Sequence, residues 1–175
     1  MTWTTFHHRE EILRNVIDVA DRRRDGLLPT SLDGVAERFD GELDLLAALQ
    51  LRWHTRLAGR IEQELAAQPL DLEAGVINAW RAVAHDMPGV RAILDRHRAE
   101  PLDEEMEHMM AKAVAKEHIL LAVMAGNAAI SDQLVTVVGA RIEQRARASY
   151  ASSGALALET GRPSLLDRLR AVLAA

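Results

Sequence analysis

The stretch from Glu42 to about Ala67 constrains the fold most, because its apolar side chains recur at every third or fourth position. Those apolar residues are Leu46, Leu49, Trp53, Leu57, Ile61 and Leu65. This spacing places them along one face and predicts a long amphipathic helix, which Gln68 and Pro69 bring to an end. No stretch of the chain alternates polar and apolar residues with a period of two, so the sequence predicts an all-α fold.

Similar apolar spacing predicts helices on both sides of this one. The predicted helices span residues 8–24, 31–38, 72–86, 88–98, 101–126, 131–149 and 164–173. Sequence signals mark several helix starts: Thr30 or Ser31 and Asp71 are suited to cap, and Pro88 and Pro101 fit a first helical position. Residues 1–6 are expected to be a loose arm, and residues 151–154 a flexible link before the last helix.

Composition narrows the classes of function. The chain has 175 residues and no cysteine, which excludes a disulfide framework. Its formal net charge of −5 argues against broad non-specific binding to nucleic acid. Charges run through the first residues, so no secretory signal is expected. No apolar run is long enough to span a bilayer. We therefore expect a cytoplasmic protein without membrane contact.

Several segments carry a family resemblance. These are REEILRNVIDVA (residues 9–20), TSLDGVA (30–36), FDGELDLLAAL (39–49), PGVRAIL (88–94) and HILLAVMAG (118–126). Taken in order they resemble the TetR family of ligand-responsive repressors. The resemblance implies a helical bundle with a short helix-turn-helix-like head at residues 1–46 and a larger ligand-binding and dimerisation body at residues 47–150. A link and a short helix at residues 151–175 would follow.

The chain departs from the family where DNA would be read. Members have a turn and a recognition helix between the second helix and the aromatic residue that matches Phe39. Here only Glu37 and Arg38 separate Ala36 from Phe39. Since a recognition helix needs two to three turns to reach base edges, the head is roughly ten residues short. Either these residues repack into an unusual reader, or DNA binding has been lost and the body kept.

Candidate DNA contacts remain in this head. They are Arg22, Arg23, Arg24, Thr30, Ser31 and Arg38. Arginine side chains and helix-capping hydroxyls contact phosphates in many DNA-binding proteins. The arginine run can also be an ordinary solvated helix end, where cations suit the helix dipole.

The middle of the chain supplies candidates for a ligand pocket, because flexible methionine and tryptophan side chains line apolar cavities and histidines can orient a ligand. The candidates are Trp80, His85, Met87, Met106, Met110 and His118. The other interpretation is that the methionines simply fill the core. The resemblance favours a cavity among the middle helices, for an apolar small molecule that the sequence does not identify.

One apolar stripe is a candidate dimer interface. It consists of Leu134, Val135, Val138 and Ile142. In the family the last two long helices pair with their symmetry mates, and a two-fold interface buries the same stripe on both chains. The resemblance therefore implies a homodimer through residues 131–149 and part of 101–126. Alternatively, the stripe packs within one subunit.

Enzyme and metal motifs are weak. Glu105-x-x-His108 has the spacing of a di-iron ligand pair, but the chain contains no second Glu-x-x-His. His108 is therefore expected at the surface or on a pocket wall, and no metal or cofactor is predicted. The sequence lacks a Gly-x-Ser-x-Gly elbow, a P-loop and a dinucleotide fingerprint, so no enzyme is predicted.

These observations leave a ranked set of functions. The first is a homodimeric TetR-like transcriptional regulator in which an apolar small molecule shifts the spacing of two DNA-binding heads. The alternative is a head-degenerate relative that does not bind DNA and acts through small-molecule or protein binding. A metal-dependent helical-bundle enzyme is the weakest hypothesis.

Overall fold

The computed structural model describes residues 3–67 and 69–160. Within these residues the chain forms helices and turns and no strand, which confirms the predicted all-α class. The helices are α1 (Trp3–Arg23), α2 (Val35–Arg38), α3 (Glu42–Ala66), α4 (Leu72–Asp86), α5 (Pro88–Ala99), α6 (Glu104–Met124) and α7 (Val135–Thr160).

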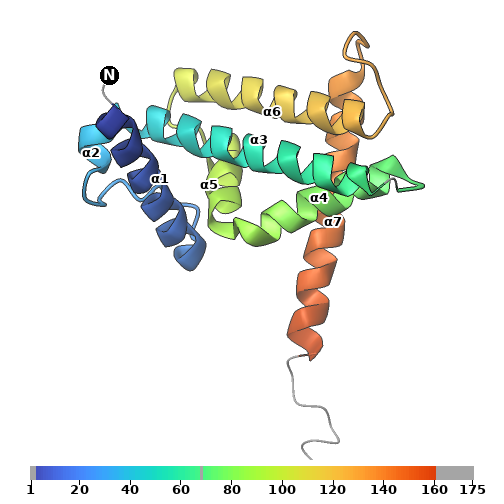
Figure 1. The fold of residues 1–175 in the computed structure, drawn as a ribbon, viewed down its shortest axis with the longest axis horizontal. Helices are drawn as coiled ribbons and strands as arrows, with labels where there is room; N and C mark the ends of the chain where they lie inside the picture. Colours follow the sequence, from blue (N-terminus) through green and yellow to red (C-terminus); the bar gives the residue numbers. More distant parts are fainter. Residues whose placement is uncertain (1–2, 68, 161–175) are drawn as a thin grey trace, which may run out of the picture.

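Helix α3 runs through the middle of the bundle (Figure 1). Helix α4 folds back against it, and α6 lies along α3 and runs in the same direction. Helix α1 packs mainly against α5, and α7 crosses α6 and α4. The second half of α7 extends away from the bundle (Figure 1). This arrangement leaves one face of α3 uncovered between α1 and α6.

The core follows the predicted stripe of α3. Leu46, Leu49, Trp53, Leu57 and Ile61 are all fully buried, which confirms that this face of the helix points inward. They pack with apolar residues from α1, α4, α5, α6 and α7 in a single cluster. Burying side chains of this size contributes about 1.5–3 kcal/mol each, so this stripe is a major source of stability.

The helix starts predicted at Asp71 and Pro88 are right, and the start predicted at Pro101 is wrong. The Asp71 carboxylate accepts a hydrogen bond from the Ala74 backbone N–H at 3.0 Å, and Pro88 is the first residue of α5, both as expected. Helix α6 begins later than Pro101 predicts. Its cap is Asp103, which accepts from the Met106 N–H at 2.8 Å. The first backbone N–H groups of a helix have no partner within the helix. A capping carboxylate accepts a hydrogen bond from one of them, whereas a proline at the first position merely lacks an N–H.

Helices α1 and α5 meet unusually closely. The Asp21 carboxylate on α1 accepts a hydrogen bond from the backbone N–H of Gly89 at 2.7 Å, so α1 caps the start of α5. A Cβ added at Gly89 would lie 2.0 Å from the backbone of Ala20, so only glycine permits this approach. Burial raises the pKa of Asp21, and hydrogen bonds from Gly89 and Val90 offset only part of that rise.

A second close crossing joins α6 and α7. A Cβ at Gly139 would lie 1.9 Å from the carbonyl oxygen of His118. The absence of a side chain at Gly139 therefore allows the two helix backbones to touch.

Both ends of the described chain differ from expectation. Helix α1 already begins at Trp3, inside the segment predicted to be a loose arm. Helix α7 begins at Val135, later than Ser131 or Asp132, and continues through the predicted flexible link at residues 151–154. The serine-rich link still permits helix because its neighbours are strong helix formers. The helix predicted at residues 164–173 lies outside the described residues.

No helix in the described part of the chain has both the length and the apolar character needed to cross a membrane.

Candidate functional site

The segment that would read DNA contains very little helix. Between α1 and α3 the structure has only α2, whose 4 residues make about one turn. Gly34 stands immediately before it with φ of 84°, a left-handed conformation that interrupts the longer helix predicted from Ser31. A Cβ on Gly34 would lie 2.6 Å from the Ile12 side chain, so this turn lies close against α1. The prediction of a helix capped by Thr30 or Ser31 is therefore wrong.

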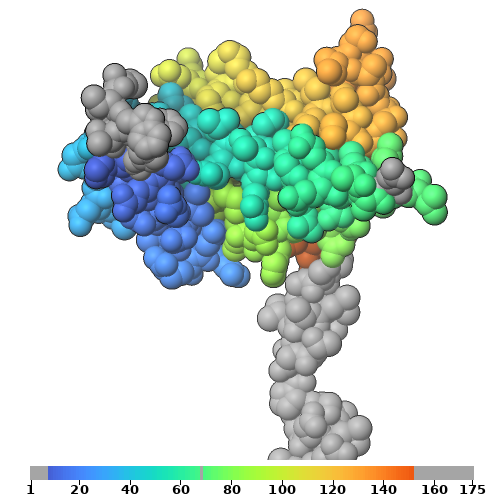
Figure 2. All heavy atoms as spheres, in the orientation of Figure 1, coloured from blue at the N-terminus to red at the C-terminus, as the bar shows by residue number. Residues whose placement is uncertain are grey.

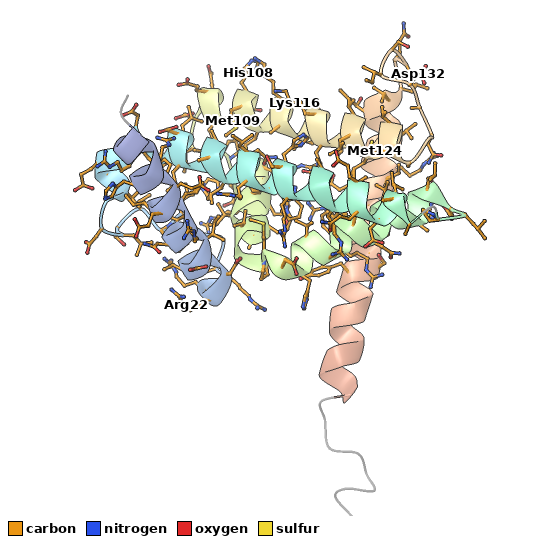
Figure 3. The ribbon with its side chains drawn as sticks, in the orientation of Figure 1. Arg22, His108, Met109, Lys116, Met124 and Asp132 are labelled. Carbon is orange, nitrogen blue, oxygen red and sulfur yellow. The ribbon has the colours of Figure 1, made fainter. Side chains whose placement is uncertain are left out.

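The candidate DNA contacts separate into two groups. Arg22, Arg23 and Arg24 are exposed at the end of α1 that lies far from α2, as the label of Arg22 shows (Figure 3). Arg23 pairs with Asp25 at 2.6 Å. Near the other end of α1, the Arg38 carbonyl accepts a hydrogen bond from Arg9 at 2.5 Å.

Thr30 and Ser31 are exposed in the turn that precedes α2. The distance along α1 from Arg9 to Arg22 is about 20 Å. The candidates therefore do not gather on one compact surface.

Most of the residues predicted to line a ligand pocket lie in the hydrophobic core. Five of the candidates are buried, with exposed fractions of 1% for Trp80, 7% for Met87, 1% for Met106, 3% for Met110 and 7% for His118. His85 is exposed at the end of α4. Trp80 and the methionines pack in the hydrophobic core, which is the ordinary interpretation of such residues. Their burial favours the core interpretation, and their role in a ligand pocket stays a prediction.

Polar groups fill the part of the core where a cavity was expected. Glu117 of α6 accepts a hydrogen bond from the indole N–H of Trp53 on one carboxylate oxygen and from that of Trp80 on the other, each at 3.0 Å. The Arg91 guanidinium lies 4.7 Å from the centre of the Trp53 ring and 3.8 Å from Glu117. Arg91 also pairs with Asp95 at 2.8 Å. A buried carboxylate needs such partners, and this one has them.

A second buried carboxylate joins α5, α6 and α7. Glu143 of α7 contacts His118 of α6 at 2.7 Å, Arg98 of α5 at 3.0 Å and Arg147 at 2.7 Å. Burial alone would raise the pKa of Glu143. The hydrogen bond from His118 and the charges of Arg147 and Arg98 outweigh burial and hold this pKa well below its ordinary value. Burial would likewise lower the pKa of Arg147, but hydrogen bonds and charges from Asp95 and Glu143 raise it.

These buried charges were missed in the sequence, although their spacing could have revealed them. Glu117 lies seven residues after Met110 and four before Leu121, which places it on the buried face of α6. Arg91 similarly follows Met87 by four residues on the apolar face of α5. A charged residue at an apolar position of a helical stripe is the signal of a buried polar cluster.

The candidate dimer stripe divides between the core and the surface. Val135 and Ile142 have exposed fractions of 6% and 1% within a single subunit, which favours packing inside the subunit, and their place in a subunit interface stays a prediction. Val138 is partly buried against the core. Leu134 is 66% exposed, and Val137 and Ile130, which were not predicted, are 62% and 73% exposed and lie close to it in the sequence.

A mainly apolar opening lies between α3 and α6. It is a hollow of about 360 Å³ lined by Ala47, Gln50, Leu51, His54, Met109, Lys112, Ala113 and Lys116. Met109 lies on the side of α6 that faces α3, whereas His108 points away from α3 (Figure 3). Leu51, which lines this hollow, is 67% exposed.

A neighbouring hollow of about 430 Å³ lies between α1 and α3. It shares Ala47 and Leu51 with the first, so the two adjoin along the exposed face of α3. We call the two hollows together the α3 groove. Figure 2 shows α3 exposed along this face between α1 and α6. Sequence analysis did not find the groove, because it depends on how far apart α1 and α6 are placed.

The charges around the α3 groove are distributed unevenly. On the α1 side, Arg9 pairs with Asp44 at 2.8 Å, and Arg52 forms an ion pair with Glu10. These charges neutralise one another. On the α6 side, Lys112 and Lys116 are exposed, and neither forms an ion pair with a residue that the structure describes. The groove therefore carries an uncompensated positive charge along one edge.

The structure offers no metal-binding cluster among residues 3–67 and 69–160. Glu105 and His108 are both exposed on α6, and no further carboxylate or histidine in this part of the chain joins them.

Comparisons with protein families, with curated proteins and with solved structures found no match to this chain.

Proposed function

We propose that this protein is a helical binding protein that holds an apolar small molecule in the α3 groove and does not read DNA sequence. The observation that carries the proposal is the exposure of Leu51 at the centre of a groove with apolar walls. Ligand sites in proteins are concave, mainly apolar and about 300–1,000 Å³ in volume, and both hollows fall within that range. A ligand that covered Leu51 would remove its apolar surface from water.

The short α2 supports the second half of the proposal. Of the two accounts that the sequence left open, an unusual reader needs a helix of two to three turns aimed at base edges. One turn in a connection packed on α1 does not provide that. The proposal thus corresponds to the head-degenerate, TetR-like alternative. The regulator hypothesis would require Arg22, Arg24 and Arg38 to build a reader without a recognition helix.

The first experiment tests DNA readout. Full-length protein is mixed with genomic fragments, including the DNA upstream of its own gene, at low and moderate salt. We expect at most weak binding that disappears with salt and shows no preference for sequence, since phosphate contacts alone carry no sequence information. Saturable, sequence-selective binding at moderate salt would reject the proposal and restore the regulator hypothesis.

The second experiment tests the groove with Nile red, an uncharged dye whose fluorescence rises in apolar surroundings. We expect saturable binding to the wild-type protein and its loss in Leu51→Asp, because the carboxylate would stand at the centre of the groove. Leu102→Asp is the matched control, since Leu102 is also exposed (60%) but lies outside both hollows. Equal dye binding by both variants would show that the groove is not the site.

A further inference from the structure

We infer that the natural ligand of the α3 groove is an anionic amphiphile: a molecule with an apolar chain and one terminal negative charge, such as a fatty carboxylate. This inference rests on the proposed function and specifies its ligand class. It comes from the positions of Lys112 and Lys116, which no catalytic or structural role described above uses.

Lysine is rare in this chain, and its placement is specific. The sequence has 21 basic residues, and only Lys112 and Lys116 among them are lysines. Both line the hollow between α3 and α6. Many arginines are instead paired with acids, as in Arg9–Asp44, Arg60–Glu64 and Arg147–Asp95. The cations that lack an acidic partner and border an apolar hollow are therefore these two lysines.

The geometry of α6 lets both lysines act on one group. They are four residues apart, which places them on the same side of the helix about one turn from each other. Each flexible side chain carries a compact charge that can turn toward an anion. None of the described residues that line this hollow is acidic, so an anionic group at its edge would meet two positive charges and no negative charge from them.

The rest of the hollow suits an apolar chain. Ala47, Leu51, Met109 and Ala113 contribute apolar side chains, and Met109 can adapt its shape to the occupant. Along α3, the distance from Ala47 to His54 is about 10 Å. Through Ala47 and Leu51 the hollow adjoins the one beside α1, where every charge already has a partner. A longer chain can therefore continue along α3 without meeting a free charge.

The test compares decanoate, decan-1-ol and decylamine, which have the same chain length and differ in charge, as competitors of Nile red on the full-length protein. We expect decanoate to compete on the order of tenfold more tightly than decan-1-ol, because two exposed charges attract its carboxylate. Decylamine should compete most weakly. In Lys112→Gln/Lys116→Gln the advantage of decanoate over decan-1-ol should disappear, while Nile red and decan-1-ol still bind.

A matched control is Arg14→Gln/Arg141→Gln, which removes the same number of positive charges from exposed positions outside both hollows. It should keep the preference for decanoate. If Nile red binds and Leu51→Asp abolishes binding, but decanoate and decan-1-ol compete equally, the anionic ligand class is wrong and the binding function stands. If Nile red does not bind in the groove at all, the proposed function itself fails.

Two further outcomes would also overturn the inference. One is displacement of Nile red by an acidic amphipathic peptide but not by decanoate, which would identify a helix as the occupant. The other is lysine-dependent binding to phosphatidylglycerol vesicles that decanoate does not reduce, which would identify a membrane surface.

Discussion

Trp53 and Trp80 meet edge to face in the centre of the bundle, with ring centroids 5.8 Å apart and an interplanar angle of 75°. Each indole N–H donates to a different oxygen of Glu117, so one carboxylate fixes the orientation of both rings. This relationship ties α3, α4 and α6 together at one point. It also explains why the middle helices enclose a packed polar core where a ligand cavity was expected.

Glu117→Gln should destabilise the fold by about 3 kcal/mol, because it removes the buried negative charge beside Arg91, which keeps its ion pair with Asp95, and turns an amide N–H₂ toward one indole. Urea unfolding followed by tryptophan fluorescence measures the change. Glu107→Gln is the control, since Glu107 is exposed on the same helix. Equal stability of the two variants would show that the hydrogen bonds to the tryptophans contribute little.

Two glycines inside helices should respond in opposite ways to alanine. Gly139→Ala should cost at least about 3 kcal/mol, since the new Cβ would lie 1.9 Å from the His118 carbonyl oxygen and force α6 and α7 apart. Gly59→Ala should stabilise by about 0.5–1 kcal/mol, because nothing lies within 4 Å of its added Cβ. Thermal denaturation of both variants tests this contrast, and a small effect at Gly139 would contradict the close crossing.

Acid should weaken the contact of α7 with α5 and α6. The pKa of Glu143 lies well below its ordinary value of 4.5 in the folded protein, so the ionised side chain stabilises the fold above that pH. Its contribution is lost as pH falls below 4.5 toward the lower pKa of the folded state.

Glu143→Gln should therefore cost about 2 kcal/mol near neutral pH and much less in acid. Urea unfolding of wild type and variant at about pH 7 and about pH 3 measures the difference. A stability gap that stays constant over this range would show that Glu143 is not a charged partner of His118 and Arg147.

The predicted homodimer can be tested at Leu134, the residue of the candidate interface that is exposed in the single subunit. Wild-type protein should have the mass of a dimer by light scattering, and Leu134→Glu should have the mass of a monomer, because Leu134 is exposed beside Val137 and Ile130. Leu102→Glu, an equally drastic change at an exposed leucine elsewhere, should leave the dimer intact. An unchanged mass for Leu134→Glu would move the interface elsewhere or remove it.

Local rules predicted much of the fold correctly. The apolar stripe of α3, the Asp71 cap and the start of α5 at Pro88 all depend on neighbours within a few residues, and the structure confirms them. The failures also have physical causes. A single left-handed residue, Gly34, interrupts the helix that its neighbours favour. Contacts between distant segments then make this turn fit against Ile12 of α1.

The candidate site could not be predicted by the same rules. Trp80 and Met106 were correctly recognised as inward-facing, but sequence alone does not say whether inward means a cavity or a packed core. In the structure, Glu117 lies beside Trp53 and Trp80 and accepts a hydrogen bond from each indole, so this part of the interior is packed with polar contacts. The α3 groove depends on the separation of α1 and α6, and that separation is fixed by their contacts with α5 and α7.

The cap that Asp21 provides for α5 makes two helices from distant parts of the chain into one unfolding unit. If α1 detaches, the Gly89 and Val90 amides lose their acceptor and the start of α5 becomes exposed to water. Local opening of α1 should therefore be rare and should occur together with opening of α5. Native-state hydrogen exchange would detect this as similar opening free energies in the two helices. The first helix would then move together with α5 and not swing independently of it.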